Sequence, residues 1–267
     1  MTKFNKLPKN IDILTYSFPC QDISQQGLQK GLNNTRSGLL YEIERILKSN
    51  KDKLPKVLLL ENVKALMSKK FINQFQDWIK TLQSLGYKSE YKIINSTEYG
   101  SCQNRERVFC VSWLDQSKSF SFPKPFEHKN SLDKIIQNKN MNSFNHLLKY
   151  KFDNFKKTKN NIWKSKLLNY TKFNSEAYIY LPKNYGPTLT ASGANSRLKF
   201  YFEKENEIKN INAYQSFLYM GFDRDDYKKI KKSNLLSESK IIYLCGNSIS
   251  VEVLEQIFSE VIKCHLI

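Results

Sequence analysis

Long apolar runs are absent from the sequence, as are the cysteine and histidine patterns that indicate a disulfide framework or a zinc site. No segment approaches the ~18 consecutive apolar residues of a membrane span, and the polar start MTKFNKLPKN lacks the apolar core of a signal peptide. The five cysteines are scattered, form no CxxC pair and lie far in sequence from the three histidines. We therefore expect a cytoplasmic protein with reduced thiols, no membrane association and no bound metal.

Acidic residues are scarce relative to basic ones. The 267 residues contain 43 Lys+Arg against 25 Asp+Glu, a formal charge of +18. Such a balance favours a polyanionic partner, of which nucleic acid is the commonest, although part of the lysine and asparagine excess can reflect an AT-rich genome. A hydrophobic content of 40% and an aromatic content of 13% indicate a folded chain of one or two domains.

The first apolar run, Ile11 to Ser24, predicts a buried strand that stops at Pro19, Cys20 and Gln21. A parallel strand that ends in a turn with one cysteine can present a nucleophile at the carboxyl edge of a sheet. The alternative is that Cys20 is a small buried hydrophobe. The polar segment after it, DISQQGLQKGLNNTRSG, is predicted to be a long loop that either closes over a substrate or only connects two elements.

A second apolar run, KVLLLENV at 56–63, predicts a parallel strand whose Glu61 lies at the same edge as Cys20. Arg105 and Arg107 lead into a further strand, where residues two apart share a face, so both guanidinium groups are expected to point into one pocket unless they are a solvated charge run. Helices are predicted from 39 to 50, from 64 to 85 and over INAYQSFLYMGF. The last segment, IIYLCGNSISVEVLEQIFSEVIKC, is interpreted as a strand, a turn and a helix.

Periodicity weakens after Leu114. Residues 114–205 are rich in Lys, Asn, Ser and Phe, and we predict a separate, irregular, basic domain there. The rest of the chain, 1–113 and 206–267, is then expected to form the other domain. Within the basic domain, YGPTLTASGANSRLKFYF combines small and hydroxyl residues with positive charge, which suits close approach to a ligand.

Five short segments in order, PCQ (19–21), ENV (61–63), QNRER (103–107), PTLTA (187–191) and GNS (246–248), resemble the DNA cytosine-5 methyltransferases. Each is weak alone, but all five in this order at strand ends are highly specific. The sequences of the segments TYSFPCQDISQQG and CGNSISVEVLE are most similar to those of bacterial enzymes that modify CpG sites.

The resemblance implies an α/β methyltransferase fold, S-adenosyl-L-methionine as cofactor, and double-stranded DNA as partner. It also implies that 1–113 and 206–267 form the catalytic domain and that 114–205 form the target-recognition domain. Cys20 then matches the nucleophile that adds to C6 of a flipped cytosine, Glu61 the acid at N3 and N4, and Arg107 the donor at O2, with Arg105 helping to hold the pocket. Pro19, Asn247 and Ser248 match cofactor contacts. DNA contacts are expected from Gln21, Ser24, Gln26, Thr188, Ser192, Asn195 and Arg197.

One part of the family pattern is missing. The family's glycine-rich first strand and the acidic residues that hold the cofactor do not occur ahead of the PCQ strand, and the chain has 9 glycines, none in such an array. The resemblance therefore implies a doubly wound sheet that lacks its first strands, with the PCQ strand at an open edge. We expect a C-terminal part of a methyltransferase that works with an N-terminal fragment, such as one of a restriction-modification system.

Two other functions are compatible with the same residues. A catalytically inactive remnant would bind duplex DNA without methyl transfer. A tRNA cytosine methylase of the same fold is disfavoured by a recognition domain of roughly ninety residues, which suits a duplex reader.

Overall fold

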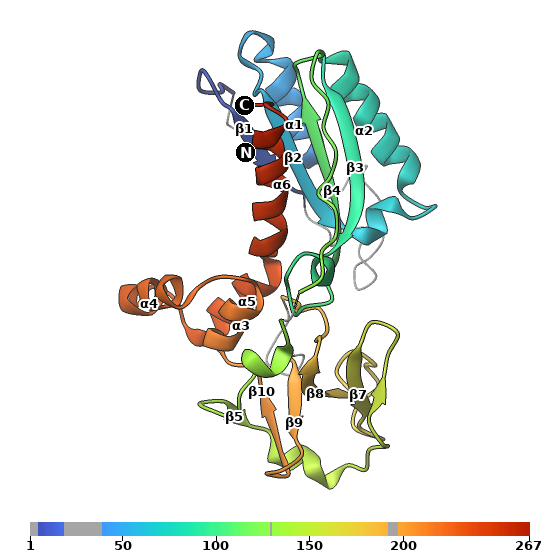
Figure 1. Ribbon diagram of the computed structural model, residues 1–267, viewed down its shortest axis with the longest axis vertical. Helices are drawn as coiled ribbons and strands as arrows, with labels where there is room; N and C mark the ends of the chain where they lie inside the picture. The colour runs from blue at the N-terminus through green and yellow to red at the C-terminus, as the bar shows by residue number, and fades with distance from the viewer. Residues whose placement is uncertain (1–4, 19–38, 129, 192–196) are drawn as a thin grey trace. The chain divides into compact units, whose positions relative to one another are not determined.

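The computed structural model describes residues 5–18, 39–128, 130–191 and 197–267. The chain forms two compact units, each built from segments far apart in sequence (Figure 1). Unit 1 comprises Met1–Ile94, Glu106–Lys124 and Gln256–Ile267, and unit 2 comprises Asn95–Arg105 and Pro125–Glu255.

Unit 1 is built on a four-stranded sheet with the order β1-β2-β4-β3. Strands β1 (Ile13–Tyr16) and β2 (Val57–Val63) run parallel, whereas β4 (Glu106–Trp113) is antiparallel to β2 and separates it from β3 (Lys88–Asn95). In the part of the chain that the structure describes, β1 stands at one edge of this sheet; that further strands are missing beside it stays a prediction. The predicted α/β class and the predicted strands at Ile11, Lys56 and Gln103 are confirmed.

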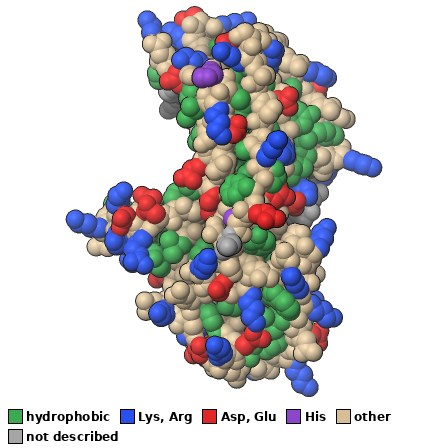
Figure 2. All heavy atoms as spheres, in the orientation of Figure 1, with side chains coloured by type: hydrophobic (Ala, Val, Ile, Leu, Met, Phe, Trp, Pro, Cys, Tyr) green, Lys and Arg blue, Asp and Glu red, His purple; other side chains and the backbone are tan. Residues whose placement is uncertain are grey.

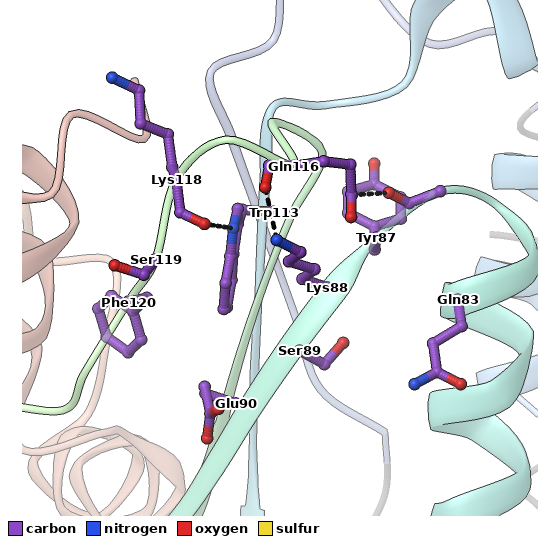
Figure 3. A pocket seen from close by; sticks show the side chains of 11 residues that line it. Gln83, Tyr87, Lys88, Ser89, Glu90, Trp113, Gln116, Lys118, Ser119 and Phe120 are labelled. Carbon is purple, nitrogen blue, oxygen red and sulfur yellow. Dashed lines mark hydrogen bonds between the residues drawn. The ribbon is translucent and has the colours of Figure 1, made fainter.

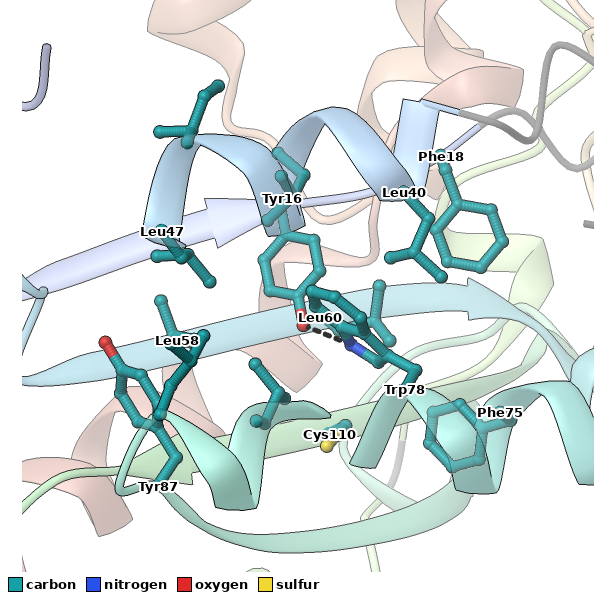
Figure 4. Packing of buried hydrophobic residues seen from close by; sticks show 14 of the residues in the cluster. Tyr16, Phe18, Leu40, Leu47, Leu58, Leu60, Phe75, Trp78, Tyr87 and Cys110 are labelled. Atoms are coloured by element: carbon teal, nitrogen blue, oxygen red, sulfur yellow. Dashed lines mark hydrogen bonds between the residues drawn. The ribbon is translucent and has the colours of Figure 1, made fainter. Parts of the chain in front are cut away.

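The core of unit 1 lies between this sheet and two helices, α1 (Leu39–Lys48) and α2 (Ile72–Ser84). Figure 4 shows Leu58 and Leu60 of β2 packed with side chains of both helices. The buried Trp78 Nε1 donates a hydrogen bond of 2.9 Å to the Tyr16 hydroxyl, which ties α2 to the end of β1. The core therefore fixes the position at which β1 ends.

Unit 2 is built on a six-stranded sheet with the order β5-β10-β9-β8-β7-β6. Its strands are β5 (Asn142–Ser143), β6 (Lys156–Lys157), β7 (Ile162–Lys166), β8 (Tyr178–Asn184), β9 (Lys199–Phe202) and β10 (Glu207–Asn210). The prediction that 114–205 is irregular is therefore wrong. These strands are two to seven residues long, too short to give a clear alternation in the sequence.

The helices of unit 2 are α3 (Ala213–Tyr219), α4 (Arg224–Ser233) and α5 (Glu238–Asn247), and α6 (Val251–Lys263) begins in unit 2 and ends in unit 1. Helix α5 corrects the strand predicted at IIYLC. The Ser237 side chain accepts a hydrogen bond from the backbone of Lys240 and caps the helix, and Ile241, Ile242 and Cys245 share its buried side. Short 3-10 turns are Lys51–Lys53, Lys64–Met67, Ser96–Glu98, Leu132–Lys134 and Asn145–Lys149.

The division into units differs from the predicted domain boundary. Residues 206–255, which the sequence assigned to the catalytic domain, cluster with 125–205. The physical reason is a shared core, in which Phe217 and Ile241 pack with Phe200 and Leu189. The functional assignment of the two parts stays a prediction.

Among the described residues, no single helix is long and apolar enough to cross a membrane; α5 and α6, bent by 41° to each other, meet that criterion together by length and composition only. No group of three or more His, Cys, Asp or Glu side chains that could hold a metal ion occurs in the same residues.

Candidate active site

The ends of β1 and β2 are held together by side-chain hydrogen bonds. Ser17 Oγ donates to the Glu61 carbonyl at 2.8 Å, and Asn62 Nδ2 donates to the Phe18 carbonyl at 3.1 Å. Because β1 and β2 are parallel, both strands reach the same edge of the sheet at these residues. The chain that leads into Pro19 and Cys20 is therefore fixed beside Glu61.

Glu61 forms an ion pair with Arg107. Glu61 Oε1 and Arg107 Nε are 3.2 Å apart, and the side chains are 12% and 17% exposed. In the antiparallel β2–β4 ladder Arg107 lies opposite Val63, so Glu61, two residues before Val63, shares its face and its side chain is within reach. Arg107 Nη1 also donates to the Glu106 carbonyl at 2.8 Å. An acid and a guanidinium group are thus held at one place on the sheet.

Arg105 does not join this pair. Strand β4 begins at Glu106, so the i, i+2 relation of a strand does not apply between Arg105 and Arg107. Arg105 is 4% exposed, and it donates to the carbonyls of Leu189 (2.9 Å), Gly246 (3.1 Å) and Ser248 (2.6 Å). All of these contacts lie within unit 2, so the prediction of one shared pocket is corrected: Arg105 holds backbone segments together.

Gln103 helps to hold the same backbone segments together. It is fully buried; its Oε1 accepts from the Leu189 backbone at 2.9 Å, and its Nε2 donates to the Tyr219 carbonyl at 3.0 Å. Thr188 Oγ1 donates to the Asn104 carbonyl at 2.7 Å. The segments QNRER, PTLTA and GNS, far apart in sequence, therefore meet in unit 2.

Gly246 is required where PTLTA crosses α5. A Cβ placed at Gly246 would lie 2.3 Å from Ala191 N and from Thr190 C, both backbone atoms that cannot rotate away. Alanine would gain about 1 kcal/mol of helix propensity, but the overlap costs about 1–3 kcal/mol or more.

We expect Gly246→Ala to lower the free energy of unfolding by up to about 2 kcal/mol in urea denaturation, because the cost of the clash exceeds the propensity gain. The neighbouring Asn247→Ala is the control, since Asn247 is exposed at the end of α5 and its replacement is expected to change stability by less than about 0.5 kcal/mol. Equal effects of the two substitutions would contradict the close approach.

Several predicted site residues lie outside the described residues: Pro19, Cys20, Gln21, Ser24, Gln26, Ser192 and Asn195. Of the remaining predicted contacts, Asn247 is exposed, and Ser248 is half-buried with its carbonyl bound by Arg105. Arg197 Nη2 donates to Ser239 Oγ at 2.7 Å, so this side chain contacts α5. The roles proposed for all of these residues stay predictions.

Three of the cysteines are unsuited to nucleophilic chemistry. Cys102, Cys110 and Cys245 are buried, and burial raises the pKa of each thiol to about 12. The thiolate is the reactive form, and at neutral pH these side chains are protonated.

We expect the folded chain, treated with iodoacetamide at pH 8, to be alkylated at Cys264, with Cys102, Cys110 and Cys245 left unmodified. Peptide mass spectrometry measures the modification at each site. The same treatment in urea should modify all five thiols. Rapid labelling of Cys110 in the folded chain would contradict the described burial.

A pocket in unit 1 lies away from Glu61. It has a volume of about 610 Å³ and is lined by Tyr87, Lys88, Trp113, Gln116 and their neighbours (Figure 3). Trp113 is opposite Val57 at the start of β2, whereas Glu61 and Arg107 lie near the other end of the same ladder. The pocket therefore has no part in the Glu61–Arg107 site.

Sequence reasoning did not identify Ser17, Asn62 or Gln103 as functional. Asn62 follows Glu61 directly and Gln103 is two residues before Arg105, both inside quoted motifs, which is a usable signal. Ser17 carried none, because its role depends on the pairing of β1 with β2.

Comparison with known proteins gives a consistent result. A model of the family described as C-5 cytosine-specific DNA methylase matches residues 1–263. Orphan methyltransferase M.SssI of Spiroplasma monobiae is 49% identical over 264 residues, which cover 97% of this chain and 67% of that protein. Type II methyltransferase M2.ScrFI of Lactococcus lactis subsp. cremoris is 34% identical over 269 residues, covering 97% and 68%.

Solved structures confirm the fold. The Entamoeba histolytica methyltransferase EhMeth superposes with a TM-score of 0.67 at 16% identity, covering 94% of this chain and 77% of that one. Dnmt2 methyltransferase of S. pombe gives 0.60 at 19% identity, covering 94% and 78%. Together with the match over residues 1–263, these similarities lead to one conclusion: the chain belongs to the C-5 cytosine-specific DNA methylase family.

Proposed function

We propose that the chain methylates C5 of a cytosine flipped out of duplex DNA, within CpG, with Cys20 as nucleophile and with the cofactor site completed by an N-terminal fragment. The observation that carries this proposal is the Glu61–Arg107 ion pair beside the end of β1 that leads to Cys20. The family is one of DNA methyltransferases, and its enzymes use S-adenosyl-L-methionine.

The chemistry requires a thiol, an acid and a cationic donor around one pyrimidine. The Cys20 thiolate adds to C6, an S–C6 bond forms, and the electrons of the C5–C6 double bond move onto C5 and the N3–O2 side of the ring. Glu61 shares a proton with N3, and Arg107 donates to O2, where negative charge develops. S-adenosyl-L-methionine supplies the methyl group. Loss of the C5 proton and of the thiolate then restores the aromatic ring and the enzyme.

Arg107 also orients the Glu61 carboxyl group before the base binds. Because Arg107 Nε is 3.2 Å from Glu61 Oε1, the carboxyl group is oriented, and a flipped base meets an acid and a donor in fixed positions. The cost of flipping is about a few kcal/mol of stacking and pairing, which contacts with the DNA must offset. Gln26, in the segment after Cys20, is proposed to fill the gap in the duplex.

We infer that the ends of β1 and β2 supply only part of the site for S-adenosyl-L-methionine. Glu61 is the only carboxylate on the described residues 13–18 and 57–63, and it is engaged by Arg107. The Ser248 carbonyl accepts from Arg105, and the Ser248 hydroxyl donates to the Ile249 carbonyl at 3.2 Å. Of the two described residues predicted to contact the cofactor, Asn247 and Ser248, only Asn247 therefore presents an exposed polar side chain. Strand β1 is an edge, where a further strand can pair. These observations support an N-terminal fragment as the missing part.

Transfer of a radiolabelled methyl group to duplex DNA tests the proposal. The chain alone is compared with the chain mixed with the part of M.SssI that it does not match, on duplexes that contain either CpG or GpC as the only cytosine step. We expect incorporation only in the mixture and only with CpG. Strong cofactor binding by the lone chain would overturn the need for a fragment, and equal labelling of GpC would overturn the CpG assignment.

DNA binding without incorporation in any mixture would instead favour the inactive DNA-binding remnant. A cytoplasmic location follows from the same proposal, since the substrate is proposed to be bacterial DNA. It stays a prediction.

A further inference from the structure

Strands β6 and β7 form a hairpin that concentrates positive charge at one edge of the unit 2 sheet. In its ladder Lys156 lies directly opposite Lys164, and Lys157 opposite Trp163. Lys166 is two residues from Lys164 on the same strand and shares its face. Like charges directly opposite each other in an antiparallel pair destabilise it, so this arrangement has a cost for the free protein.

The surrounding sequence does not neutralise these lysines. Residues 149–172 contain eight lysines and one acidic residue, Asp153. In the part of the chain that the structure describes, no ion pair is seen for a lysine of this segment. Lys164 Nζ instead lies 4.0 Å from the centre of the Tyr178 ring, and Lys166 Nζ donates to Asn174 Oδ1 at 2.9 Å. Figure 2 shows Lys and Arg side chains over the part of unit 2 that carries β7.

The turn of the hairpin is linked by a hydrogen bond to the QNRER segment, which in turn contacts the PTLTA segment. Asn160 Nδ2 donates to Asn104 Oδ1 at 3.1 Å, and the Asn104 carbonyl accepts from Thr188 Oγ1. Both contacts lie within unit 2. The turn between the two lysine-bearing strands is therefore linked through Asn104 to Thr188, the residue for which the resemblance implies a DNA-backbone contact.

We propose that the β6–β7 hairpin binds the phosphate backbone of duplex DNA through Lys156 and Lys164, with Lys166 at the end of the same row. This inference rests on the proposed function only in taking duplex DNA as the partner. Phosphates supply the negative charge that the opposed lysines lack, and each neutralised phosphate releases condensed counterions, so the contact contributes affinity that does not depend on base sequence.

The test is the salt dependence of duplex binding by the full chain, measured by fluorescence anisotropy over a range of KCl concentrations. The variant is Lys156→Gln/Lys164→Gln. The control is Lys231→Gln/Lys232→Gln, which removes the same charge from exposed positions of α4 in the same unit. For two phosphate contacts, we expect the slope of log K against log[KCl] to become less negative by about 1.8 in the hairpin variant and to stay unchanged in the control.

A second measurement separates a binding role from a structural one. Removing opposed like charges should leave the thermal midpoint of the free chain unchanged or raise it, whereas a structural role predicts a fall. A lower midpoint, or equal changes of slope in both variants, would overturn the proposal. If the unmodified chain binds duplex DNA but transfers no methyl group in any mixture, the methyltransferase function fails while the hairpin result still stands on its own slope.

Discussion

Glu61→Gln is expected to lower the rate of cytosine activation by a factor of about 10² to 10⁴, because the amide cannot give a proton to N3. The amide oxygen can still face Arg107 Nε as a neutral polar partner, so we expect the fold to be retained. The readout is exchange of the C5 hydrogen of cytosine in duplex DNA with solvent. This exchange requires only addition of the thiol at C6, protonation at C5 and reversal, so it proceeds without the cofactor.

Glu106→Gln is the matched control for this substitution. Glu106 is the neighbour of Arg107, but its carboxylate pairs with Lys64 at 2.9 Å in an exposed position, with side chains 39% and 54% exposed. Exposed pairs contribute about 0–1 kcal/mol, so both exchange and stability should change little. Equal losses of exchange at Glu61 and Glu106 would remove Glu61 from the mechanism.

Arg105→Ala is expected to have the largest effect on stability, a loss of about 3–5 kcal/mol in urea denaturation of the full chain. The substitution removes the donor for three carbonyl groups, those of Leu189, Gly246 and Ser248, in a junction where Arg105 is 4% exposed. The PTLTA and GNS segments then lose the group that connects them.

Arg105→Lys should recover only part of this loss, since an ammonium group cannot reach three carbonyls with the planar fork of a guanidinium. A loss below about 1 kcal/mol for Arg105→Ala would show that the junction is held by other contacts. Full recovery by lysine would show that charge, and not the geometry of the donors, matters there.

The sequence predicts β1 and β2 well because their signal is local. The run VLLL of β2 is buried on both faces and stops at Glu61, so its continuity and its end are visible without tertiary information. The same reasoning fails at IIYLC, where a short apolar run suits a buried helix as well as a strand, and the cap at Ser237 decides the outcome.

The strands of unit 2 are hard to predict from the sequence because asparagine residues form the turns between them. Asn161 lies between β6 and β7, and Asn206 between β9 and β10, and both adopt positive φ angles of 58° and 53°. Asparagine tolerates this left-handed conformation and so permits tight turns between very short strands. In a chain rich in asparagine, these turn residues do not stand out from the composition.

The two arginines show why the site could be predicted only in part. Arg107 and Glu61 meet because of strand register, which follows once the pairing of β2 with β4 is known. The role of Arg105 depends on residues more than eighty positions away, Leu189, Gly246 and Ser248, which no local pattern brings together.

The most direct measurement is exchange of the C5 hydrogen in duplex DNA by the unmodified chain and by Cys20→Ser, followed by mass spectrometry in deuterated water. If Cys20 adds to the base beside Glu61 and Arg107, the unmodified chain accelerates exchange and Cys20→Ser does not, although both bind the duplex equally. Exchange by Cys20→Ser at the rate of the unmodified chain would contradict the account.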